Sequence, residues 1–85
     1  MATKAIKFYA DWCGPCKVYA KTWDKVASEF SDVDFENVNI EKDTTGMAAK
    51  YKVSSIPHTV VVKDGTINAK TGRLSAEELK NLILN

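Results

Sequence analysis

The sequence is organised around one stretch, Trp12-Cys13-Gly14-Pro15-Cys16-Lys17. Its two cysteines are the only ones in the chain, and they stand three positions apart directly after an apolar run. Two thiols at this spacing at the start of a helix can close a small disulfide ring and reopen it without moving the backbone far. We therefore interpret this stretch as a reversible redox site.

A helix is predicted to begin within this stretch. Gly14 removes the side-chain obstacle to a tight turn, and Pro15 is tolerated in a first helical turn because its missing N–H would have no partner there. The unpaired N–H groups and the helix dipole then place partial positive charge beside Cys13. This favours its thiolate and lowers its pKa, and the thiolate is the form that attacks disulfides. Cys13 is therefore the predicted nucleophile and Cys16 the shielded partner.

The other segments alternate between strand and helix patterns. Residues 4–10 are almost continuously apolar, apart from Lys7, which is typical of a strand buried on both faces. From Pro15 to about residue 30, apolar residues, among them Trp23, recur at helical spacing, which predicts an amphipathic helix with Trp23 in the core. The remaining predicted elements are a strand at 35–39, a short helix from Asp43 or Thr44 to about 51, strands at 59–63 and near 66–70, and a last helix after a capping box of Ser75 and Glu78.

Residues 10–17 (ADWCGPCK) resemble the thioredoxin active-site signature. Further along, Ile56-Pro57 resembles the cis-proline segment of that family, Asp64-Gly65 its hairpin turn and Gly72 the glycine before its last helix. The resemblance implies an α/β, thioredoxin-like βαβαββα fold, with a four-stranded mixed sheet of order 2-1-3-4, strand 4 antiparallel, and helices on both faces. Residues 1–85 would form a single domain. Usual members carry one more strand and helix before the first strand, for which the sequence has no room before Lys4.

The resemblance also implies an activity, the reduction of protein disulfides, and a set of site residues. Cys13 and Cys16 would be catalytic, and a cis bond before Pro57 would turn the Ile56 backbone toward an extended substrate segment. No cofactor would be bound, because electrons would come from NADPH through a flavin-containing thioredoxin reductase. The residues expected to support the active site are Trp12, Gly14, Pro15, Lys17 and Lys7, and those expected to bind substrate are Trp12, Ile56, Pro57 and Gly72.

Two positions depart from the family pattern. Lys7 stands where typical thioredoxins have a buried Asp behind the second cysteine. Its ammonium could approach Cys16 and favour the thiolate, or it could extend to solvent along an apolar stem. His58 follows Pro57 where the family more often has Thr, and we expect a partly exposed residue at the start of a strand.

Other uses of the cysteines stay open at this point. A permanent disulfide closing so short a loop would constrain the unfolded chain little, and a zinc site would find only His58 as a further typical nitrogen ligand. A glutaredoxin-like enzyme that uses glutathione is another alternative, although glutaredoxins usually carry Pro-Tyr where this motif has Gly14-Pro15. A third is a thioredoxin-fold binding subunit of another enzyme, in which the thiols are dispensable.

The charge balance narrows the partners. Twelve Lys and Arg residues against eleven Asp and Glu give a net charge of +1, which argues against binding driven by nucleic-acid phosphates or anionic membranes. Lys4 and Lys7 interrupt any secretory apolar run, and no segment reaches transmembrane length. We therefore expect a cytoplasmic monomer with protein partners, in a compartment that keeps thiols reduced.

Overall fold

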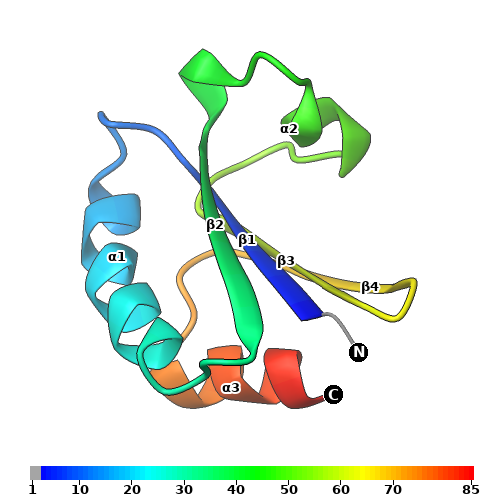
Figure 1. Ribbon diagram of the computed structural model, residues 1–85. Coiled ribbons are helices and arrows are strands. Elements are labelled where there is room, and N and C mark those ends of the chain that lie inside the picture. The colour runs from blue at the N-terminus through cyan, green and yellow to red at the C-terminus, as the bar shows by residue number, and fades with distance from the viewer. Residues whose placement is uncertain (1–2) are drawn as a thin grey trace.

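The computed structural model describes residues 3–85, and its elements follow the predicted order (Figure 1). They are β1 (Thr3–Tyr9), α1 (Gly14–Ala27), β2 (Val33–Asn39), the 3₁₀ turn η1 (Ile40–Lys42), α2 (Met47–Lys50), β3 (His58–Lys63), β4 (Thr66–Thr71) and α3 (Ala76–Leu84). No helix within residues 3–85 is both long and apolar enough to cross a membrane.

The four strands form one sheet in the order β2-β1-β3-β4, as predicted. β1 lies parallel to β2 and antiparallel to β3, and β3 lies antiparallel to β4. The expected strand directions therefore need one correction, because β3, and not β4, opposes the other strands. The connection between β2 and β3 contains no helix long enough to run the length of the sheet. α2 has four residues and advances about 6 Å, so this segment does not form the long crossover helix that usually joins parallel strands.

Helices cover both faces of the sheet, as expected (Figure 1). On one face, Ala5 and Val61 pack against buried residues of α1 and α3, among them Trp23. On the other face, the buried cluster of Ile6, Phe8 and Val60 packs against α2 and the segment that follows it. Neighbouring residues of β1 thus serve opposite layers, which explains why almost the whole strand is apolar.

A buried hydrogen bond fixes α1 on the sheet. The hydroxyl groups of Tyr19 in α1 and Thr59 in β3 lie 2.7 Å apart. Burial is the main reason that the pKa of Tyr19 rises to about 12. The Trp23 ring meets Phe35 of β2 edge to face at 5.3 Å, so α1 is held against three strands of the sheet by Tyr19, Trp23 and their neighbours.

Local capping sets the helix ends. α1 ends at Ala27, earlier than predicted, with Ser28 as its C-cap. The Ser28 N–H makes the last helical bond, to the carbonyl of Asp24, and its hydroxyl donates to the carbonyl of Lys25. Both carboxylate oxygens of Asp43 accept N–H groups at the start of α2, from Met47 and Ala48. The predicted capping box of Ser75 and Glu78 is present at the start of α3.

Candidate active site

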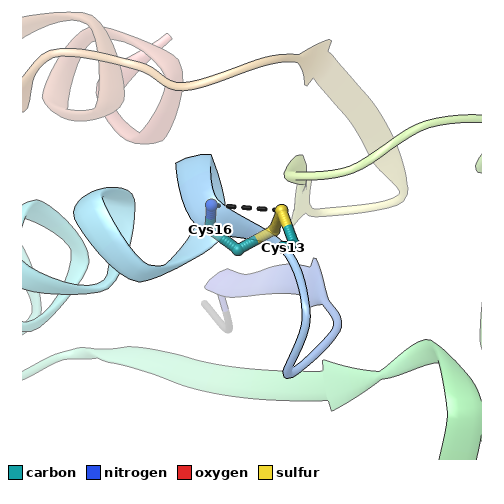
Figure 2. The surroundings of a disulfide bond; sticks show 2 residues. All are labelled: Cys13 and Cys16. Atoms are coloured by element: carbon teal, nitrogen blue, oxygen red, sulfur yellow. Dashed lines mark hydrogen bonds between the residues drawn. A yellow bond between two sulfur atoms is a disulfide. The ribbon is translucent and has the colours of Figure 1, made fainter.

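A disulfide joins Cys13, in the loop between β1 and α1, to Cys16, in the first turn of α1 (Figure 2). The chain turns after Tyr9, with the Cys13 N–H donating to the Ala10 carbonyl at 3.1 Å. Cys13 is the N-cap of α1, and its Sγ accepts the backbone N–H of Cys16 at 3.1 Å. The helix therefore begins within the motif, as predicted, and one of its free N–H groups points at the Cys13 sulfur.

Gly14 and Pro15 occupy the first turn of α1. Pro15 is accommodated there as predicted. The expected reason for Gly14 is wrong, however, because its φ is not among the positive values of this chain and a Cβ at Gly14 would meet nothing within 4 Å. The turn itself does not need a glycine. A glycine at this exposed position instead leaves the surface beside Cys13 without a side chain.

The two sulfur-bearing residues face different surroundings. Cys13 is 5% exposed and Cys16 is 2% exposed, and the neighbouring Trp12 is 66% exposed. Trp12 lines an apolar groove of about 370 Å³, which runs over residues of η1 and α2 and the segment before β3. The other lining residues are Ile40, Ala48, Val53, Ser54, Ser55 and Ile56. Ile40, Ala48 and Val53 were not predicted as site residues, because only the fold brings them beside the motif.

The segment before β3 lies next to the disulfide. Ile56 packs against the buried cluster of Ala10, Cys13 and Cys16, and the peptide bond between Ile56 and Pro57 is cis. The Pro57 carbonyl accepts the N–H of Gly72 at 2.8 Å. Gly72 has a φ of +99°, a conformation that side chains rarely adopt. The predicted substrate-binding residues from separate parts of the sequence therefore gather at one end of the sheet.

Lys7 lies on the α1 face of the sheet, beneath the start of that helix. It is only 5% exposed, and its ammonium lies 5.5 Å from the ring centre of Tyr9 and 5.7 Å from that of Trp23. This contradicts the interpretation in which its stem simply carries the ammonium out to bulk solvent. Burial lowers the pKa of Lys7, and the negative charge of Asp24 opposes that shift.

Lys7 and Cys16 line the same cavity. It has a volume of about 180 Å³, and its lining residues are Lys7, Tyr9, Ala10, Asp11, Cys16, Lys17 and Ala20. Lys17, which was predicted to support the active site, is exposed and lies at this cavity and away from the groove of Trp12.

His58 is buried, which corrects the expectation of a partly exposed residue. It is 8% exposed, its Nδ1 lies 2.9 Å from the hydroxyl of Thr71, and its ring centre lies 6.2 Å from that of Phe8. Its Nε2 is buried and has no hydrogen-bond partner within the part of the chain that is described. Burial lowers the pKa of His58. Thr71 was missed because it pairs with His58 only through the β3–β4 register.

A metal site needs several ligand side chains around one point. No group of three or more His, Cys, Asp and Glu side chains among residues 3–85 is placed to hold a metal ion. The cysteines are joined to each other, and the His58 Nδ1 is engaged by Thr71.

Comparisons with known proteins agree with this architecture. A thioredoxin from Mycoplasma genitalium is 45% identical over 60 residues, which are 71% of this chain and 58% of that protein. A thioredoxin from Chlamydia pneumoniae is 37% identical over 79 residues, or 92% of this chain and 76% of that protein. The X-ray structure of Fasciola hepatica thioredoxin matches with a TM-score of 0.86 and 31% identity, over 98% of this chain and 79% of that one.

The extent of these matches differs between the comparisons. The chain spans 58% of the length of the thioredoxins from Mycoplasma genitalium and Mycoplasma pneumoniae. The protein-family model described as Thioredoxin matches residues 2–85. Because that match covers nearly every residue, the chain belongs to the thioredoxin family.

Proposed function

We propose that this protein is a thiol–disulfide oxidoreductase that reduces disulfides in other proteins. One observation carries the proposal. The Cys13 Sγ caps α1 and accepts the Cys16 N–H, beside the exposed Trp12 and an apolar groove. After reduction, the same N–H and the helix dipole would stabilise a Cys13 thiolate at a surface that a protein substrate can reach.

The proposed reaction has two exchange steps. The Cys13 thiolate attacks one sulfur of the substrate disulfide, so that a mixed disulfide forms and the other substrate sulfur leaves as a thiolate. Cys16 then loses its proton and attacks the Cys13 sulfur, which releases the second substrate sulfur and forms the Cys13–Cys16 disulfide. Two electrons pass from the dithiol to the substrate, and its two thiolates take up two protons.

Substrate binding is assigned to the surface around Trp12, Ile56, Pro57 and Gly72. Trp12 and Ile56 line the groove, and Gly72 holds the Pro57 carbonyl. An extended substrate segment could lie across this surface with an apolar side chain in the groove, while its disulfide meets Cys13. The apolar lining supports protein substrates over small polar disulfides.

Regeneration of the dithiol is the other half of the proposed cycle. We propose a flavin-containing thioredoxin reductase as the electron donor, with NADPH consumed by that enzyme and no cofactor held by this chain. A Cys13–Cys16 pair that cycles between disulfide and dithiol suits a compartment that keeps thiols reduced, and we propose the cytoplasm. We also propose that the protein works as a monomer.

Insulin reduction tests the proposal. Wild-type protein with NADPH and a thioredoxin reductase should cleave the insulin disulfides, Cys13→Ser should not, and the exposed helix variant Val18→Ser should match wild type. Activity of Cys13→Ser equal to wild type would remove the proposed mechanism. If glutathione and glutathione reductase support turnover but thioredoxin reductase does not, the electron donor is wrong and the exchange chemistry stands.

A further inference from the structure

Lys7 is a buried cation without a counter-ion in direct contact among residues 3–85. Within residues 3–85 it forms no ion pair, whereas Lys4 on the same strand pairs with Glu36 at 3.3 Å. Its cross-strand neighbours, Asn37 on β2 and Thr59 on β3, are uncharged. A buried charge without a partner is costly, so its position calls for an explanation beyond packing.

Aromatic rings determine where the ammonium sits. Tyr9 and Trp23 each present a ring within 6 Å of the Lys7 Nζ, and such contacts favour a cation over these rings. Cys16, Ala20 and Trp23 follow one another at helical spacing on the side of α1 that faces the sheet. Ala20 carries a small side chain and lines the cavity together with Cys16 and Lys7.

The other charged groups around this cavity leave the Lys7 charge largely unbalanced. Asp24 acts on Lys7 from α1 at long range, without an ion pair. Asp11 and Lys17 line the cavity, carry opposite charges and are exposed to solvent. Solvent screens exposed charges more strongly than buried ones. Lys7 is therefore the charge best placed to act on the Cys16 sulfur through the protein interior.

We propose that Lys7 is a positioning residue that stabilises the thiolate of Cys16 across the shared cavity and so assists the second exchange step. This inference rests on the proposed function. The Cys16 thiol gives its proton to solvent through the cavity, and the resulting thiolate attacks the Cys13 sulfur of the mixed disulfide. The bond from Cys13 to the substrate breaks, the Cys13–Cys16 bond forms, and the electron pair leaves on the substrate sulfur. Lys7 keeps its proton throughout.

This role gives a pH signature that a packing role does not. At a pH well below the Cys16 titration Cys16 is a thiol, and Lys7 has no Cys16 thiolate to stabilise. As the pH rises through that titration, the ammonium favours the reduced protein, and the redox equilibrium shifts toward the dithiol form. Redox equilibria of wild type and Lys7→Met with glutathione should coincide at acid pH and diverge above the Cys16 titration.

A direct titration of Cys16 tests the inference without any turnover. In a Cys13→Ser background Cys16 is the only thiol, and its ionisation can be followed by thiolate absorbance or by the rate of alkylation. Adding Lys7→Met should lower the thiolate fraction at a given pH about tenfold, equivalent to a rise of about one pKa unit. Lys4→Met removes the same charge from the opposite face of β1 and should leave the titration unchanged.

Three outcomes separate the possibilities. An unchanged Cys16 titration in Lys7→Met overturns the inference even if insulin reduction is normal. If Lys7→Met shifts the Cys16 titration but the wild-type protein does not reduce insulin, the inference is supported and the proposed function is overturned. If Lys7→Met does not fold, an NMR titration of Lys7 in the wild-type protein decides. Coupling between two charges is reciprocal, so the Cys16 thiolate of the reduced protein must raise the pKa of Lys7 above its value in the oxidised protein. Equal Lys7 titrations in the oxidised and reduced proteins overturn the inference.

Discussion

The two faces of the sheet meet the disulfide in different ways. On the α2 face lie an apolar groove lined by Trp12 and a buried His58 beside Phe8, its partner on β1. On the α1 face lies a small cavity with Cys16 and a buried lysine. One face therefore offers surface to a partner, and the other offers charge to the second cysteine. We therefore expect that substrate binding and the second exchange step can be altered separately in this protein.

Substitution of the two cysteines should give the largest difference, in the amount of mixed disulfide that each variant accumulates. With a disulfide-bearing protein, Cys16→Ser should accumulate a mixed disulfide through Cys13, because the first step proceeds and the second cannot. Cys13→Ser should accumulate little, since Cys16 is covered from the substrate side. Non-reducing electrophoresis and mass spectrometry measure the adduct, and alkylation of reduced wild type should label Cys13 first. A stable adduct through Cys16 would reverse the assigned roles.

Trp12 should affect substrate binding with little effect on the thiols. Trp12→Ala removes the exposed aromatic wall of the groove, and loss of such a contact raises KM by about tenfold when it contributes about 1.4 kcal/mol. Insulin reduction kinetics measure this change, with Ile67→Ala on β4 as the control for loss of an exposed apolar side chain. The alkylation rate of Cys13 should stay unchanged, and a fall in that rate would assign Trp12 to the chemistry itself.

Local signals in the sequence predict most of the fold. The apolar run of β1, Pro15 at the start of α1 and the capping box of α3 each depend on neighbouring residues, and each is present in the structure. The direction of β3 is less accessible, because it depends on how far the chain between β2 and β3 can travel. The gathering of Cys13, Ile56 and Gly72 was predicted only through resemblance to a family.

The surroundings of single polar residues could not be predicted in the same way. His58 is buried because Thr71, thirteen positions away, meets it across the β3–β4 ladder. Lys7 is held by a ring from its own strand and by Trp23 from α1. Such contacts depend on side chains that tertiary packing brings together, whereas sequence periodicity reports only which face a residue occupies.

Removing the buried charge on the α1 face should stabilise the fold. Oxidised Lys7→Met should unfold in denaturant with a free energy about 1 kcal/mol above wild type near neutral pH, because the folded protein no longer has to desolvate an ammonium. Lys4→Met loses a half-exposed ion pair and should change stability by less, in the destabilising direction. A marked loss of stability in Lys7→Met would mean that the aromatic contacts outweigh desolvation.

Lys7→Met should also remove a pH dependence of the free energy of unfolding. Folding lowers the pKa of Lys7, so between its folded value and 10.5 the unfolded chain binds more protons and stability rises with pH. Above pH 10.0 the raised pKa of Tyr19 acts in the opposite direction. Denaturation of oxidised wild type at alkaline pH below that value should show the rise, and Lys7→Met should lack it.

The smallest expected effect belongs to His58 on the α2 face. Folding lowers its pKa through burial, so the unfolded chain takes up a proton near pH 6.5 while the folded chain stays neutral to lower pH. Stability is therefore fully present above pH 6.5 and falls as the pH drops from there through the folded pKa. A single proton limits the slope to about 1.4 kcal/mol per pH unit. Because His58 is the only histidine, urea denaturation between pH 7 and 5 should isolate it.

His58→Thr supplies the matched measurement, since Thr suits a strand and does not titrate in this range. Its unfolding free energy should change less than that of wild type over the same interval. Protonation of His58 should also affect the groove, because His58 begins β3 directly after Pro57 and Ile56, and Ile56 lines the groove. If the His58 ring charges without loss of stability, water reaches its Nε2, and the α2 face is then more open to solvent than the α1 face beneath Cys16.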